Sequence, residues 1–255
     1  MNRPLIALTA AAALGLSATA QAGEPLKIGI SAEPYPPFTY TSSEGEWTGF
    51  EVELGMAICE AMERDCEITP TGWSGIIPSL KAGRIDMIMN SMSITAARQR
   101  VIDFSEPYYF TPGAFVAAED LTLAGPDDLD GKVLGVQAAT TNATYARRAL
   151  RDQVGDIRLY DQAEQVNRDL LSGRLDVILA DKIAMTELLE RDEAEGFEIK
   201  ATAPRHEAYG EGVGIGIRQD DDTLETDLNA AIAKVREDGT CRALSEQYFD
   251  TDICT

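Results

Sequence analysis

The chain has few of the side chains on which metal binding and nucleophilic catalysis depend. His206 is the only histidine, and no two cysteines are spaced as C-x-x-C. A zinc site needs several such ligands, and a Ser-His or Cys-His pair needs a histidine beside its nucleophile. We therefore expect no metal, no cofactor and no nucleophilic catalytic centre, and we interpret His206 as a surface histidine.

Basic residues are also scarce, and long apolar runs are confined to the N-terminus. The chain has 22 Lys and Arg residues against 43 Asp and Glu residues, a net charge of −21. This balance argues against nucleic acid and anionic membrane surfaces as partners. The apolar run 5–16 is too short to span a bilayer. It follows Arg3 and precedes Ala20-Gln21-Ala22, which is typical of a signal peptidase site.

These features predict a secretory signal peptide over residues 1–22, cleaved after Ala22; an N-terminal membrane anchor is the alternative. The mature chain would carry 21 basic residues against 43 acidic ones, a net charge near −22. Because no other run approaches the length of a membrane span, we expect an exported protein that is free in solution.

Four cysteines in an exported chain predict two disulfides. Their spacing favours Cys59 with Cys66 and Cys241 with Cys254 over the two crossed connectivities. Within one helix, Cys59 and Cys66 would lie about 10.5 Å apart along the axis, whereas a disulfide needs Cα atoms within roughly 7 Å. The helix that contains Cys59 should therefore end near Arg64, and Cys66 should open the next strand.

A small-Gly-Arg-apolar-Asp pattern occurs twice, at residues 82–86 and 172–176, each time before an apolar run. In each copy the glycine, Gly83 or Gly173, fits the C-terminal cap of a helix. Around the first copy, apolar spacing predicts strands at 26–30, 66–71 and 85–89 and helices at 49–64 and 75–82. Around the second it predicts strands at 133–136, 157–160 and 177–179 and helices at 141–150 and 162–171. This alternation is typical of an α/β sheet with parallel strands.

The C-terminal part is too short for a third domain. It contains a predicted strand at 212–217, a helix at 223–237 and a short helix ending near Tyr248. We expect it to return to the first lobe, so that the chain crosses between lobes near 110–113 and 204–212. Lobe 1 would then hold 23–110 and 212–255, and lobe 2 would hold 111–211.

This organisation predicts a hinged clamp, in which two α/β lobes are joined by two strands. Open α/β sheets bind ligands at the carboxyl ends of their strands. The residues after the two buried strands, Asn90–Ser93 and Asp181, should therefore face the cleft.

Several motifs, in their order and spacing, carry a resemblance to a known family. They are YPPF (35–38), GFEVEL (49–54), GIIPSLKAGRID (75–86), SMSITAAR (91–98), IDFSEPYY (102–109), VGIGIR (213–218) and DGTCRALSEQYF (238–249). With them, the whole mature chain resembles the periplasmic solute-binding proteins of polar amino-acid ABC importers, which bind lysine/arginine/ornithine, histidine or glutamine. The resemblance implies a type II periplasmic-binding-protein fold with two parallel-type sheets, and a monomer that delivers its ligand to a membrane permease.

The resemblance also implies a site for a free L-amino acid. Arg98 would bind the α-carboxylate through its planar guanidinium, with Ser93 and Thr141 as further donors. Ser91 and Asp181 would bind the α-ammonium from different lobes, so that the ligand favours lobe closure. Each residue also has a structural interpretation: Arg98 as a helix-surface residue, the two serines as turn or cap residues, and Asp181 as the cap of a helix at Lys182.

Tyr35 and Trp73 match the aromatic positions that enclose the ligand's side chain, where a cation gains from the ring faces; a core position is the alternative for Trp73. Two departures affect this pocket. Relatives that bind basic side chains place an acid at the position of Ala32, and a glycine is usual at Ala139. Further polar residues that we expect in the side-chain pocket are Glu33, Asn90, Asn142 and Glu211.

An enzyme on the same fold is the rival hypothesis, because cyclohexadienyl-dehydratase-like proteins share it. Catalysis would need an acid or base beside the reacting carbon of the ligand. Glu33 and Glu211 are the candidate acids. We favour the binding protein, with a polar and possibly basic amino acid as its ligand.

Overall fold

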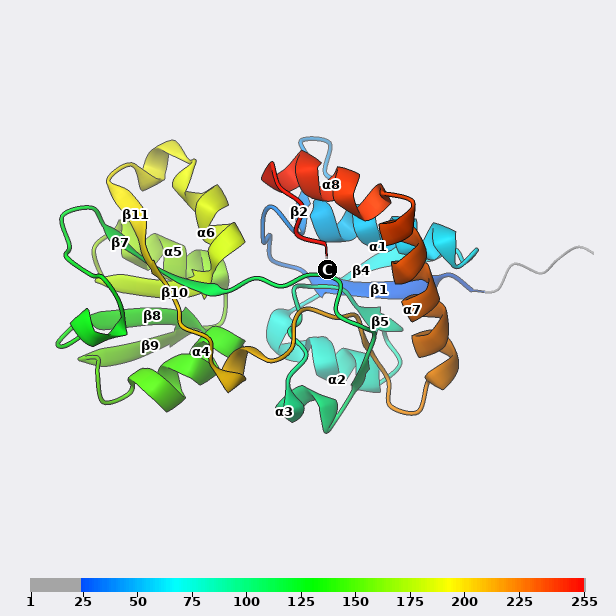
Figure 1. Ribbon diagram of the computed structural model, residues 1–255, viewed down its shortest axis with the longest axis horizontal. Coiled ribbons are helices and arrows are strands. Elements are labelled where there is room, and N and C mark those ends of the chain that lie inside the picture. The colour runs from blue at the N-terminus through cyan, green and yellow to red at the C-terminus, as the bar shows by residue number, and fades with distance from the viewer. Residues whose placement is uncertain (1–23, 255) are drawn as a thin grey trace, which may run out of the picture.

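The computed structural model describes residues 24–254, so the predicted signal peptide lies outside the described residues. In this range the chain forms two lobes side by side, joined by crossing segments (Figure 1). Each lobe of residues 24–254 is built on a five-stranded sheet, with strand orders β4-β1-β5-β12-β6 and β11-β7-β10-β8-β9. Across the same range, no helix is long and apolar enough to cross a membrane.

The elements of the two lobes have the following bounds. The first lobe contains β1 Leu26–Ser31, β2 Tyr40–Thr41, β3 Trp47–Thr48, α1 Phe50–Ala61, β4 Cys66–Thr71, α2 Ile76–Lys81, β5 Met87–Ile88, α3 Ala96–Gln99, β6 Asp103–Phe104, β12 Gly216–Ile217, α7 Asp222–Glu237 and α8 Thr240–Phe249. The second contains β7 Gly113–Ala118, β8 Val133–Gln137, α4 Thr141–Tyr145, β9 Asp156–Tyr160, α5 Ala163–Leu171, β10 Val177–Asp181, α6 Lys182–Leu189 and β11 Phe197–Thr202.

The predicted two-lobed α/β fold is confirmed, and each sheet also contains antiparallel pairs that the sequence analysis did not anticipate. β12 runs antiparallel to β5 and β6, and β7 runs antiparallel to β10 and β11. Both β7 and β12 follow a crossing, so they enter their sheet from the direction of the other lobe. The strand predicted at 212–217 is reduced to β12, because Val213 instead bridges to Ser93 and Tyr109 within the crossing region.

The repeated Gly-Arg-apolar-Asp pattern marks the same unit in both lobes. Gly83 and Gly173 have φ angles of 68° and 71°, the left-handed conformation that glycine adopts at a helix end. The carboxylate of Asp86 accepts a hydrogen bond from the N–H of Lys27 at 3.0 Å, and Asp176 accepts one from the N–H of Val133 at 2.7 Å. Each aspartate therefore fastens its turn to the beginning of a neighbouring parallel strand.

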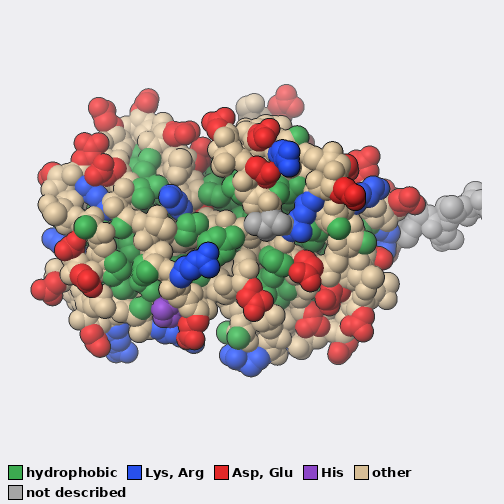
Figure 2. All heavy atoms as spheres, in the orientation of Figure 1, with side chains coloured by type: hydrophobic (Ala, Val, Ile, Leu, Met, Phe, Trp, Pro, Cys, Tyr) green, Lys and Arg blue, Asp and Glu red, His purple; other side chains and the backbone are tan. Residues whose placement is uncertain are grey.

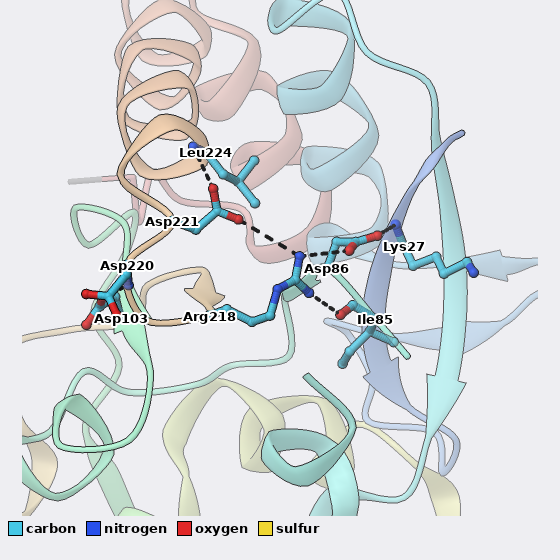
Figure 3. A network of polar contacts seen from close by, with 8 residues as sticks. All are labelled: Lys27, Ile85, Asp86, Asp103, Arg218, Asp220, Asp221 and Leu224. Carbon is cyan, nitrogen blue, oxygen red and sulfur yellow. Dashed lines mark hydrogen bonds and ion pairs between the residues drawn. The ribbon is translucent and has the colours of Figure 1, made fainter. Parts of the chain in front are cut away.

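In the first lobe, Asp86 also holds the returning C-terminal segment (Figure 3). Arg218 follows β12 and donates to Oδ1 of Asp86 at 3.1 Å and to the carbonyl oxygen of Ile85 at 2.9 Å. Its guanidinium lies 3.9 Å from Asp221, whose other oxygen accepts from the N–H of Leu224 in α7. One guanidinium thus joins the N-terminal and C-terminal parts of the lobe.

Both predicted disulfides are present, and their Cα atoms lie 6.2 Å apart in each case. Helix α1 ends at Ala61, and Cys66 is the first residue of β4, as the spacing argument requires. The second disulfide joins α8 to the C-terminal segment, where Cys254 forms a β-bridge with Tyr109 in the first crossing. The bond between Cys241 and Cys254 therefore holds the end of the chain against the hinge.

The double variant Cys241→Ser/Cys254→Ser removes the second disulfide and leaves no free thiol. It should be less stable than the wild type. We expect the free energy of unfolding to fall by about 2–4 kcal/mol, because the unfolded chain regains the entropy of the opened loop. Urea unfolding of the variant and the wild type measures the difference. Peptide mapping without reduction that finds crossed pairs or free thiols would contradict the pairing.

Candidate functional site

A cavity of about 690 Å³, including its open mouth, lies between the lobes where β5 and β10 end. Most of the predicted site residues line it, namely Glu33, Tyr35, Trp73, Asn90, Ser91, Ser93, Arg98, Thr141, Asn142 and Asp181. Glu211 does not. Glu211 lies in the second crossing, where its N–H donates to the carbonyl oxygen of Ile94, and its side chain is exposed. The structure therefore removes Glu211 both from the side-chain pocket and from the candidate catalytic acids.

Arg98 is positioned by helix α3, whose N-cap residue Thr95 accepts a hydrogen bond from the N–H of Arg98. Its guanidinium donates to the carbonyl oxygen of Ser93 at 2.8 Å and, from the other lobe, to that of Ala139 at 3.1 Å. It also lies 5.5 Å from the ring centroid of Trp73. Burial lowers the pKa of Arg98 to about 10, so the group stays charged at neutral pH.

Asp181 ends β10 and its side chain caps helix α6. The same carboxylate could therefore both cap the helix and bind a ligand. Its Oδ1 accepts from the hydroxyl of Thr111 at 2.9 Å and from the N–H groups of Ile183 and Ala184 at 2.9 and 3.3 Å. Its Oδ2 accepts no hydrogen bond from any residue in 24–254. Burial raises the pKa of Asp181 to about 7, and the hydrogen bonds oppose that rise.

Glu51 is a residue of the site region that the sequence analysis missed. Its carboxylate is fully buried and accepts hydrogen bonds from the N–H of Ser91 at 2.8 Å, from the hydroxyl of Ser91 at 3.0 Å and from the hydroxyls of Tyr108 and Tyr109. Ser91 itself has a φ of 49°, which is uncommon for a residue other than glycine. Burial raises the pKa of Glu51, and the hydrogen bonds oppose that rise.

The Glu51 network limits what Ser91 can do in the cavity. The hydroxyl of Ser91 donates to Glu51 and accepts from the hydroxyl of Tyr109 at 2.9 Å, so it offers a ligand only an acceptor lone pair. A sequence signal for Glu51 existed, because it shares a helix face with the apolar residues Leu54 and Ile58. A carboxylate on an apolar face needs buried partners.

Hydrogen bonds also connect the lobes directly across the cavity. Nε1 of Trp73 donates to the carbonyl oxygen of Ala138 at 3.1 Å, and Nε2 of Gln162 donates to Glu33 at 3.3 Å. The bonds from Trp73 to Ala138 and from Arg98 to Ala139 fix the loop before α4. Ala139 has a φ of 60°, a conformation that costs an alanine roughly 1–2 kcal/mol and a glycine nothing.

The remaining predicted residues also have local partners or neighbours. Asn90 is buried and accepts from the N–H of Ser31 at 2.7 Å, so part of its amide is used by the fold. The ring of Tyr35 stacks on Phe38, with centroids 5.8 Å apart. Thr141 is the first residue of α4, while the capping hydroxyl belongs to Thr140.

Two hinged α/β lobes around a cleft are the architecture of periplasmic solute-binding proteins, and here opposite charges line the cleft from the two lobes. Residues 26–251 match the model for bacterial extracellular solute-binding proteins, family 3, and the chain belongs to this family. It is 37% identical over 253 residues to an L-arginine-binding protein of Pseudomonas aeruginosa, with 97% of each chain covered.

Solved structures show the same likeness. An ancestral arginine-binding protein bound to arginine superposes with a TM-score of 0.82 at 28% identity, covering 89% of this chain and 99% of that one. An ancestral amino acid-binding protein, described as a precursor of cyclohexadienyl dehydratase, has a TM-score of 0.78 at 27% identity and covers 88% and 95%.

Replacing Glu51 by Gln should destabilise the fold, because an amide NH₂ then faces the hydroxyl and N–H donors that the carboxylate accepted. We expect the free energy of unfolding at pH 7 to fall by about 1–3 kcal/mol, the cost of a buried donor left unpaired. Glu60→Gln, on the exposed side of the same helix, is the matched control and should change little. Equal stability of the two variants in urea unfolding would contradict the structural role of Glu51.

Proposed function

We propose that the chain is the substrate-binding subunit of an ABC importer and captures a basic L-amino acid, with L-arginine as the first candidate. In this role it binds the amino acid outside the cytoplasmic membrane, closes its lobes around it and delivers it to a membrane permease. The proposal treats the mature chain as a binding protein without catalytic activity.

One observation carries the proposal: Arg98 and Asp181 line the same cavity from different lobes and do not pair with each other. Neither forms a salt bridge with any residue in 24–254. A free α-amino acid presents a carboxylate and an ammonium on one carbon, so it complements both charges at once. Because the two charges belong to different lobes, the bound ligand would favour contact between the lobes.

The other lining residues support a basic side chain. Arg98 is the only Lys or Arg that lines this cavity in the described part of the chain, while Glu33 and Asp181 both contribute carboxylates. An acidic ligand would place a second carboxylate without a basic partner. An aliphatic ligand would leave the buried Oδ1 of Asn142 without a partner, which costs roughly 1–3 kcal/mol.

The enzymatic alternative has specific support in the similarity to the dehydratase precursor and in the raised pKa of Asp181, about 7. A carboxyl group that titrates near neutrality can act as a general acid. Binding accounts for the same carboxylate more directly, because its Oδ1 is fixed by three hydrogen bonds and Oδ2 suits an ammonium. The relatives named for arginine binding also favour this interpretation.

Titration with a panel of amino acids, followed by calorimetry and by Trp73 fluorescence, tests the proposed function. We expect arginine, lysine or ornithine to bind most tightly, with histidine and glutamine weaker and glutamate and leucine weakest. Arg98→Ala should weaken arginine binding by about 2–5 kcal/mol, because the ligand carboxylate loses its charged partner in a desolvated site.

Arg84→Ala is the control for this test, because Arg84 is exposed and does not line the cavity. It should leave arginine binding unchanged. Tightest binding of glutamate or leucine would contradict the ligand class. Formation of new products from prephenate or arogenate would favour the enzymatic alternative.

The binding of an ammonium group should depend on pH through Asp181. Burial favours the protonated carboxyl, so this group stabilises the ligand-free fold at low pH and loses that contribution as pH rises toward 7. Ligand binding has the opposite sign, because only the ionised carboxylate attracts an ammonium. Arginine affinity should therefore rise up to about tenfold per pH unit below pH 7 and level off above it. Calorimetry between pH 5 and 8 measures this, and Asp181→Asn should bind weakly with a flat profile.

A further inference from the structure

Two residues that line the cavity each carry a buried side-chain oxygen that forms no hydrogen bond within residues 24–254. These oxygens are the hydroxyl of Tyr209 and Oδ1 of Asn142. The Tyr209 side chain is almost wholly enclosed, with 8% of the residue exposed, and burial raises the pKa of its hydroxyl, so the group is neutral. Buried polar groups are normally paired, and an unpaired one on a residue that lines a cavity calls for an explanation.

Gly113 brings these two oxygens to one place. A Cβ on Gly113 would lie 2.5 Å from Oδ1 of Asn142 and 2.6 Å from the hydroxyl oxygen of Tyr209, so any larger residue would displace at least one of these side chains. Gly113 lies directly opposite Asp181 in the antiparallel pair of β7 and β10. Side chains of directly opposite residues share a face of the sheet. The carboxylate of Asp181, the amide oxygen and the hydroxyl therefore lie on the same side of these strands.

Tyr209 is held too firmly to turn its hydroxyl elsewhere. It ends the short 3₁₀ helix Glu207–Tyr209, which His206 caps by accepting the N–H of Ala208 at Nδ1. His206 is half-buried and visible on the surface (Figure 2), where the sequence analysis expected it, and its ring nitrogen caps this turn. The ring of Tyr209 packs on that of Tyr145, with centroids 5.4 Å apart. The next residue, Gly210, has a φ of 72° and approaches the backbone of Ile94 so closely that no side chain would fit.

We infer that Tyr209 and Asn142 bind N–H groups of the ligand beside Asp181 and make the second lobe selective for a ligand rich in N–H donors. The inference rests on the proposed function. Oδ1 of Asn142 and the carboxylate of Asp181 can only accept hydrogen bonds, and the hydroxyl of Tyr209 can accept as well as donate. A ligand carboxylate would be repelled by this set, and an alkyl group would leave it unpaired. An ammonium or guanidinium satisfies all three oxygens.

The inference predicts an uncommon combination of effects for Tyr209→Phe. The binding of L-arginine should weaken about tenfold, the loss expected for a hydrogen bond to a charged group. The melting temperature of the ligand-free variant should stay unchanged or rise, because the deleted hydroxyl has no protein partner in residues 24–254. A purely structural hydroxyl predicts the reverse, a lower melting temperature with unchanged affinity.

Tyr145→Phe is the matched control. Tyr145 belongs to the same aromatic cluster, is 2% exposed and does not line the cavity. It should bind L-arginine as the wild type does. Asn142→Leu is the second test variant, since it removes the amide oxygen at similar volume, and it should also bind L-arginine about tenfold more weakly.

The measurements are calorimetric titration of each variant with L-arginine and thermal unfolding without it. Wild-type affinity in both Tyr209→Phe and Asn142→Leu would overturn the inference while leaving the proposed function intact. A wild-type protein that binds no arginine, lysine or ornithine would instead contradict the proposed function. Weaker binding in both variants, with an unaffected Tyr145→Phe, supports the inference.

Discussion

The buried carboxylate of Glu51 is the constraint around which the first lobe and the hinge are arranged. A charge without solvent contact persists only if its oxygens are fully hydrogen-bonded. Here the donors come from Ser91, after β5, and from Tyr108 and Tyr109, in the first crossing. One side chain from α1 thus holds a wall of the cavity and the segment that leads to the second lobe. Ser91 has its unusual positive φ at the position where its N–H donates to this carboxylate.

The two lobes share one local unit, a helix with a glycine cap followed by an aspartate and a buried strand, and they differ in the residues that face the cavity. In both lobes an aspartate after a glycine cap receives the N–H of a neighbouring strand, which fixes where the buried strand begins. Beyond the strands, the first lobe provides Arg98 and the second provides Asp181, and neither charge has an ionic partner within residues 24–254. Acidic side chains are scattered over the visible face of both lobes and outnumber the basic ones there (Figure 2).

The sequence predicted what local patterns encode and missed what the crossings supply. Apolar periodicity and the twin glycines were enough for β1, β4, β8 and the helices between them. Strands β7 and β11 belong to no repeat and were not predicted, and the strand predicted at 212–217 carried no sign of its direction, so the antiparallel pairs were not foreseen. Tyr209 went unnoticed for a similar reason: it reaches the cavity from the second crossing, where no local pattern indicates which side chains turn inward. Glu211, two residues further on, was assigned to the pocket and instead lies exposed.

The β-bridge between Cys254 and Tyr109 has a practical consequence for how the protein can be handled. Any tag or fluorescent fusion added after the last residues would begin beside the first crossing, where bulk or tension would act directly on the hinge. The opposite end of the described chain enters β1 at the outer side of the first lobe, away from the second lobe (Figure 1). A label placed there should leave lobe motion unhindered. A C-terminal label would lie beside the hinge and would itself alter the lobe motion that it was meant to report.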